Sequence, residues 1–190
     1  MKYLGFPDFD HGQTPSIGVL ITNLGTPDAP EARALRPYLK QFLSDPRVVE
    51  VPRLLWWLIL NGIILRVRPR RSAEAYQTVW TDDGSPLLVH TREQAQALQR
   101  VLGQRHGPNI TVSFGMRYGQ PSIAGALQDL LDSGVRQLLV LPLYPQYGGP
   151  TTGSTFDAVA ADFTARRWVP DFRFVAHYCD HPGYISAVAD

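Results

Sequence analysis

The chain has 190 residues, of which 18 are basic and 17 are acidic, and it contains a single cysteine. This length can bury one sizeable core, and the near-neutral charge argues against a protein that binds nucleic acid. The single cysteine, Cys179, excludes an internal disulfide and a four-cysteine zinc or iron–sulfur site. Residues 1–15 are polar and lack the apolar run of a signal peptide, so we expect a disordered tail and a cytoplasmic protein.

Runs of β-branched and aliphatic residues alternate along the chain with segments of helical periodicity. Strands are predicted at Ser16–Leu24, Asn109–Gly115, Val135–Leu143 and Phe172–Tyr178. Helices are predicted at Ala32–Leu43, Ala73–Val79, Thr91–Leu102, Ser122–Leu131 and Phe156–Arg167. Strands that alternate with helices favour a parallel sheet with helices on both faces. We therefore expect one doubly wound α/β domain over residues 16–190, with a sheet of about four strands.

The most hydrophobic stretch, Leu54–Leu65, lies between basic residues. It is too short to span a bilayer as a helix, which needs about 20 apolar residues. One explanation is a buried helix with charged flanks. The other is an exposed lip over 53–71 that contacts a membrane surface or covers a hydrophobic ligand, because tryptophans beside arginines are typical of interfacial segments. The Asn61-Gly62 pair in its middle argues against a regular core helix.

Four arginines follow this stretch: Arg66, Arg68, Arg70 and Arg71. They could form a solvated turn. Alternatively they recognise carboxylates, for which the planar guanidinium group is well suited. A substrate that is both hydrophobic and carboxylate-bearing would use an apolar segment and an arginine cluster together.

The segment Leu138–Thr155 is an apolar strand that runs directly into a loop rich in aromatic, glycine and hydroxyl residues. In α/β sheets, ligands bind just beyond the carboxyl ends of the strands. The segment contains no Cys, His, Asp or Glu, so it resembles a binding wall more than a source of a nucleophile or base. Tyr144 and Tyr147 offer flat faces, and hydroxyl groups come from Thr151, Thr152 and Ser154. This composition favours a flat aromatic ligand with polar edges.

Two other arrangements of residues could form sites. His177, Cys179 and His181 could share one end of a strand and bind a metal, but two unrelated histidines explain this pattern better, and we expect no metal site. Gly153-Ser154-Thr155 opens a predicted helix, where phosphate can bind. The loop lacks the lysine of the GxxxxGK[ST] pattern, so a phosphate-binding domain is the weaker alternative.

Four segments carry a more specific resemblance: Gly18–Pro30, Ala75–Leu87, Phe114–Ile123 and Leu141–Ser154. In this order and spacing the chain resembles the ferrochelatase family, lyases that insert ferrous iron into protoporphyrin IX to make haem. The resemblance implies a Rossmann-like domain that forms the amino-terminal part of a longer protein. A second, similar domain is absent from this chain, and the porphyrin would bind between the two. The uncapped helix-like segment Pro182–Asp190 also suggests a chain that continues.

The resemblance also implies site residues. The positions that match porphyrin-binding residues are Leu24, Arg68, Tyr76, Ser85, Arg117, Tyr118, Tyr144 and Tyr147. The catalytic histidine and glutamate are expected beyond Asp190, so this chain alone is expected to be inactive. Iron and porphyrin are substrates, and no permanent cofactor is expected. Gly148-Gly149-Pro150 stands where some members have an iron–sulfur cysteine, so no cluster is expected. A chelatase for coproporphyrin or sirohydrochlorin and a non-catalytic porphyrin- or haem-binding module remain as alternatives.

Overall fold

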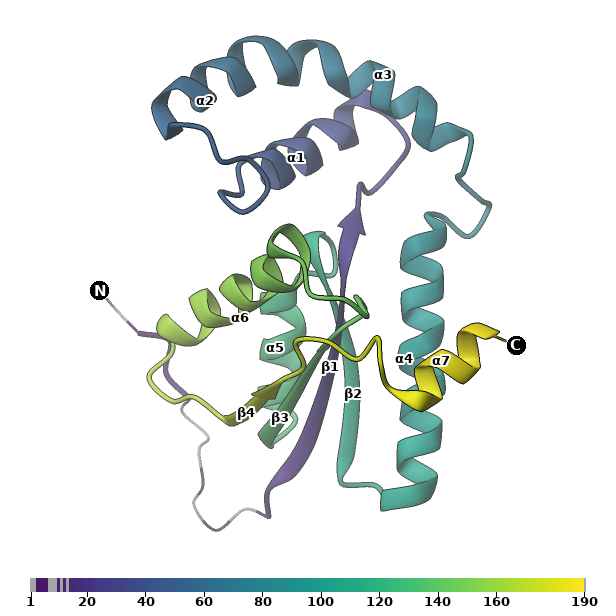
Figure 1. The fold of residues 1–190 in the computed structure, drawn as a ribbon. Helices are drawn as coiled ribbons and strands as arrows, with labels where there is room; N and C mark the ends of the chain where they lie inside the picture. The colour runs from purple at the N-terminus through teal and green to yellow at the C-terminus, as the bar shows by residue number, and fades with distance from the viewer. Residues whose placement is uncertain (1–2, 7–9, 11, 13, 190) are drawn as a thin grey trace.

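The computed structural model describes residues 3–6, 10, 12 and 14–189 of the chain. It is an α/β fold with a four-stranded, all-parallel sheet in the order β2-β1-β3-β4 (Figure 1). The elements in chain order are β1 Ser16–Thr26, α1 Ala32–Leu43, α2 Arg53–Ile59, the π-helical turn η1 Leu60–Ile64, α3 Leu65–Gln77, α4 Pro86–His106, β2 Ile110–Gly119, α5 Ile123–Asp132, β3 Val135–Pro142, the π-helical turn η2 Gly149–Gly153, α6 Ser154–Thr164, β4 Asp171–Phe174 and α7 Pro182–Ala189. The predicted fold class is confirmed.

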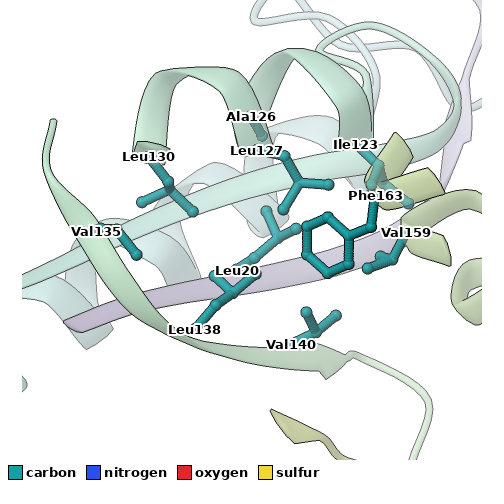
Figure 2. Packing of buried hydrophobic residues seen from close by; sticks show 10 residues of the cluster. All are labelled: Leu20, Ile123, Ala126, Leu127, Leu130, Val135, Leu138, Val140, Val159 and Phe163. Carbon is teal, nitrogen blue, oxygen red and sulfur yellow. The ribbon is translucent and has the colours of Figure 1, made fainter. Parts of the chain in front are cut away.

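The sheet is covered on both faces because its central strand β1 is apolar on both sides. Leu20 of β1 points toward α5 and α6, where it joins a cluster that includes Leu127 and Val159 (Figure 2). Its neighbours Val19 and Ile21 point to the opposite face and pack with Ala95 of α4. Successive side chains of a strand point to opposite faces, so one short run supplies both cores.

A separate helical layer lies beyond the carboxyl end of the sheet. It consists of α1 and the continuous curved segment α2-η1-α3, and β1 points toward it (Figure 1). This layer has its own core, built around Leu35, Leu39, Leu60 and Leu65. Tyr118 of β2 is buried in the same cluster, so the layer is packed directly onto a strand end. The carboxyl edge of the sheet therefore faces helices as well as loops.

Strands β1 and β2 extend further than predicted, past Leu24 and Gly115. They stay paired through Gly25↔Tyr118 and Thr26↔Gly119. Gly25 has φ +106°, and a Cβ there would lie 1.8 Å from the carbonyl oxygen of Tyr118. Gly119 has φ +85°, and a Cβ there would lie 2.4 Å from the carbonyl oxygen of Thr26. Because glycine has no Cβ, the two backbones can approach this closely. Arg117 and Tyr118 consequently lie within a strand, not beyond one.

Other element ends also differ from the sequence prediction. The strand predicted to run to Tyr178 ends at Phe174, and the helix predicted from Phe156 begins at Ser154, directly after η2. Most of the predicted tail 1–15 lies outside the described residues or has no regular structure. Within it, the Leu4 backbone donates to the carbonyl oxygen of Ala165 and accepts from the N–H of Arg167, at 2.8 and 3.0 Å.

Most of the segment Leu54–Leu65 is exposed and only Leu60 and Leu65 are buried, so the buried-helix explanation is wrong for most of it. Helix α2 buries none of its residues. Leu54 is 76% exposed and Trp57 is 59% exposed, while Leu60 in η1 is the point where the segment enters the core. Only the inner side of α2-η1-α3 meets α1, so the rest of this hydrophobic surface faces outward. Among the described residues, no helix is long and apolar enough to cross a membrane.

Candidate functional site

A buried carboxylate gathers polar groups from β2, α6 and its own loop at the carboxyl edge of the sheet. Asp45 follows α1, and its Oδ2 accepts hydrogen bonds from Ser154 Oγ at 2.5 Å, Tyr118 Oη at 2.8 Å and Arg117 Nη2 at 2.6 Å. Its Oδ1 accepts from the backbone N–H of Arg47 at 2.8 Å. The Asp45 side chain is only 3% exposed. This group is called the Asp45 network below: Asp45, Arg117, Tyr118 and Ser154.

The network holds Asp45 in its ionised form. Burial alone would raise the pKa of this carboxyl, but hydrogen bonds from Ser154 and Tyr118, the Arg47 backbone N–H and the Arg117 charge together lower it below its usual value. Burial also raises the pKa of Tyr118 to about 12, so this phenol stays protonated and donates to the carboxylate. The network is therefore a satisfied buried ion pair with both hydroxyls in defined roles.

Arg117 is held along one edge of its guanidinium group. Its Nε donates to the carbonyl oxygen and the hydroxyl of Ser154, at 2.9 and 2.6 Å, and its Nη2 donates to Asp45. The guanidinium carbon lies 4.6 Å from the centroid of the Tyr118 ring. The side chain keeps 19% of its surface exposed, and no described residue accepts a hydrogen bond from Nη1. Arg117 is thus fixed and still partly accessible.

Tyr144 lies beside this network, in the loop after β3. Its hydroxyl is buried and has no hydrogen-bond partner among the described residues. Burial raises the pKa of this phenol, and the nearby Tyr118 and Arg117 act on it as well, in opposite directions. Arg117, Tyr118 and Tyr144 therefore converge at one place, although Tyr118 is fully buried and offers no exposed ring face.

Tyr76 and Leu24 lie at the junction of the sheet with the helical layer. Tyr76, near the end of α3, meets the ring of Tyr38 edge-on, with centroids 6.3 Å apart. The Tyr38 hydroxyl donates to the carbonyl oxygen of Gly25 at 3.3 Å. Leu24 packs against the same cluster. Both predicted residues are partly buried, so each keeps some surface for a ligand.

The structure separates the four arginines after the hydrophobic segment. Arg68 and Arg71 line a hollow of about 560 Å³ on one flank of α3. Its other lining residues are Ile63, Ile64, Val67, Ser72 and Ala75. Arg66 and Arg70 line a different hollow, of about 450 Å³, together with Arg33 and Arg36 of α1. Apolar walls beside guanidinium groups suit a hydrophobic ligand with carboxylates. Both hollows contain apolar residues and arginines, but the first has more aliphatic side chains and fewer arginines.

The two remaining predicted residues, Ser85 and Tyr147, are not members of the Asp45 network. Ser85 precedes α4 and is 5% exposed, with no hydrogen bond from its side chain to the helix. Tyr147 is 60% exposed in the loop before η2, near Arg47. Arg47 in turn forms a two-point ion pair with Asp157 of α6. Ser85 is therefore buried at the start of α4, whereas Tyr147 is exposed.

No metal-binding cluster occurs among the described residues: no three His, Cys, Asp or Glu side chains come together there. Cys179 is a free, partly buried thiol. The sequence reasoning also missed one residue. Asp45-Pro46 was interpreted only as the end of a helix, because nothing in the local pattern shows that a loop aspartate will meet residues 72 and 109 positions away.

This geometry defines a class of protein: a parallel α/β fold whose aromatic and charged groups gather at the carboxyl edge, where ligands bind in such sheets. A sequence model of the ferrochelatase family matches residues 16–190, and the chain belongs to this family. It is 64% identical over 189 residues to the ferrochelatase of Idiomarina loihiensis, and 61% identical over 189 residues to that of Marinobacter nauticus. Both alignments cover all of this chain, which spans about half the length of these curated relatives (52% and 51%).

Proposed function

We propose that this chain is the porphyrin-binding half of an enzyme that inserts ferrous iron into protoporphyrin IX. The observation that carries the proposal is the convergence of Arg117, Tyr118 and Tyr144 at the carboxyl edge of the sheet, in a chain of the ferrochelatase family. Family membership alone would support the reaction but would not indicate which surface binds the porphyrin.

The residues supply what binding a flat, hydrophobic dicarboxylic acid requires. The Arg68 hollow offers apolar contacts and guanidinium groups for the propionates. Tyr76 and Leu24, both partly buried, offer aromatic and aliphatic surface. Metal insertion also needs a macrocycle bent out of plane and a base for the pyrrole protons. We assign this chain to holding and bending, and the histidine and glutamate to the remainder of the protein.

The binding role is tested by titrating the intact protein with protoporphyrin IX and following porphyrin fluorescence. Arg68→Gln should weaken binding about tenfold, because it removes one charge-assisted hydrogen bond of about 1.5 kcal/mol. Arg70→Gln is the matched control, since Arg70 belongs to the other hollow and should leave affinity unchanged. The dimethyl ester of the porphyrin should bind both variants alike. Equal losses for the two variants would contradict the assignment of Arg68.

An iron-insertion assay separates the enzyme from its alternatives. We expect the 190-residue chain to bind porphyrin without turnover, and a protein extended to the length of its relatives to insert iron. Binding without turnover in the extended protein would favour a non-catalytic porphyrin- or haem-binding module. Tighter binding of coproporphyrin or sirohydrochlorin than of protoporphyrin would favour a chelatase for a more carboxylated tetrapyrrole.

The exposed lip suits contact with a membrane surface. Leu54, Trp57 and Ile63 are 76%, 59% and 62% exposed, and arginines flank them on both sides. We propose that the lip, residues 53–71, rests on the inner face of the cytoplasmic membrane, where it would admit a membrane-dissolved porphyrin directly. The protein itself would otherwise be cytoplasmic.

A further inference from the structure

We propose that Asp45 is a positioning residue of the porphyrin site, which it serves by fixing the orientation of Arg117. This inference rests on the proposed function, because it concerns the same site. Asp45 touches no ligand in this view; it determines which edge of the Arg117 guanidinium group the ligand meets.

Asp45 connects three separate parts of the fold. Asp45 arrives from the loop after α1, Arg117 and Tyr118 come from β2, and Ser154 is the first residue of α6. One oxygen, Asp45 Oδ2, accepts from all three side chains at 2.5–2.8 Å. A single carboxylate therefore ties the helical layer, the sheet and α6 together at the point where the predicted site residues meet. Removing it frees all three donors at once.

The guanidinium group of Arg117 has two edges that can donate hydrogen bonds. Arginine has five N–H groups in a rigid plane. Nε and Nη2 use one side of that plane on Ser154 and Asp45. The N–H groups of Nη1 and the second N–H of Nη2 point away from this side, and the Arg117 side chain is 19% exposed. Because the edge formed by Nε and Nη2 is held by Ser154 and Asp45, the orientation of the other edge is fixed. That edge, formed by Nη1 and Nη2, can donate two parallel hydrogen bonds to a ligand acceptor.

Only a carboxylate at position 45 can anchor Arg117 in this way. The Asp45 oxygen faces three donors, and the isosteric asparagine would carry no charge to hold Arg117 and would present an amide group to one side of the network. Glutamate would add a methylene to a side chain that is 3% exposed, in a packed interior. An arginine released from this anchor has several rotamers available, so the ligand would meet a mobile group in place of a fixed one.

The experiment is a double-mutant cycle on protoporphyrin affinity in the intact protein. Asp45→Asn and Arg117→Gln should each weaken binding about tenfold. If Asp45 acts through Arg117, the double variant should bind no more weakly than Arg117→Gln alone, because the second change has nothing left to orient. A residue that only stabilises the fold would give losses that multiply.

Asp162→Asn is the matched control for stability. Asp162 pairs with Arg166 at 2.6 Å, and both side chains are less than 10% exposed (9% and 6%), so this variant breaks a buried ion pair elsewhere on α6. It should lower the melting temperature while leaving porphyrin affinity within twofold of the unmodified protein. Arg117→Lys covers the case in which Asp45→Asn does not fold: lysine keeps the ion pair but has no second edge, so affinity should again fall about tenfold.

The outcomes are distinguishable. If the unmodified protein does not bind porphyrin, the proposed function fails. If it binds, and Asp45→Asn changes affinity no more than Asp162→Asn, or its effect multiplies fully with that of Arg117→Gln, the positioning role is overturned while the proposed function stands. Unchanged affinity in Arg117→Lys would also overturn it.

Discussion

Helices α5 and α2 are both rich in aliphatic residues, yet they have opposite environments. Helix α5 buries five of its ten residues, and α2 buries none of its seven. In α5 the apolar residues recur every three or four positions and form one stripe that faces the sheet (Figure 2). In α2 they are consecutive and surround the helix, so no single neighbour can cover them.

The difference shows that hydrophobicity alone does not predict burial. Two hydrogen bonds attach helix α2 to the end of α1: the Trp56 indole N–H donates to the carbonyl oxygen of Leu43 and the Arg53 guanidinium group to that of Ser44, both at 2.6 Å. Around these two contacts, Leu54, Trp57 and Leu58 remain more than half exposed (76%, 59% and 55%). A stripe indicates a partner within the fold, whereas an all-round apolar surface indicates a partner outside it.

The largest effect is expected in the α5 core. Leu127→Ala removes a fully buried side chain (0% exposed) and should lower the free energy of unfolding by about 2–5 kcal/mol, through lost burial and a residual cavity. Leu54→Ala, the same change in α2, should stay within about 0.5 kcal/mol. Urea denaturation followed by circular dichroism measures both. Similar losses would mean that α2 is covered after all.

The second effect concerns the contact between the helical layer and the sheet. Asp45→Asn leaves Arg117 without its anion and should cost about 3 kcal/mol at pH 7. The folded pKa of Asp45 is depressed, so its contribution is present above the unfolded value of about 3.9 and is lost as pH falls through the folded value. The stability difference between the two proteins should therefore shrink below about pH 4. A difference that is constant down to pH 2 would show that ionisation plays no part.

A smaller effect is expected at the start of α5. The Ser122 hydroxyl accepts from the backbone N–H of Gly125 at 3.1 Å and caps the helix. Ser122→Ala should lower the free energy of unfolding by about 1 kcal/mol. Ser122→Asp keeps an acceptor and should restore most of that loss, which the same denaturation experiment measures. Equal stability in all three proteins would mean that the cap contributes nothing.

The smallest effect on stability is expected for changes in the exposed face of α2, which should instead weaken binding to lipid vesicles. Replacing Leu54 and Leu58 together by Gln changes two exposed side chains and should alter the free energy of unfolding by less than about 0.5 kcal/mol each. Co-sedimentation with vesicles that contain anionic lipid should fall several-fold, because apolar area and cationic flanks act together. Vesicle binding that is unchanged would remove the membrane role of the lip and leave the porphyrin site untouched.

Much of the architecture follows from local patterns. The continuous aliphatic run of β1, the three-and-four spacing of α5 and the alternation of strands with helices are sufficient for a four-stranded parallel α/β fold. The strand ends were less predictable. Gly25 of β1 faces Tyr118 of β2, and Gly119 of β2 faces Thr26 of β1. Because neither glycine has a Cβ, the two backbones can approach closely and the strands stay paired past Leu24 and Gly115.

That the named residues bind a porphyrin remains a prediction, and the structure shows only where they lie. Arg117 and Tyr144 were identified from their motifs, and the structure brings them together. The sequence does not show that Arg68 and Arg70 line different hollows, because helical geometry separates them; the choice of Arg68 stays a prediction. The burial of Tyr118 was also unexpected, since a tyrosine at a strand end reads equally well as core or as contact surface.

The order of residues determined the secondary structure, the parallel topology and the family, because periodicity and motif spacing are properties of neighbouring positions. Only the tertiary structure decided that Asp45 anchors Arg117, Tyr118 and Ser154, and that α2 stays exposed. Hydrogen bonds and burial arise between segments far apart in the chain, up to 109 residues for Asp45 and Ser154, and such contacts leave no local pattern.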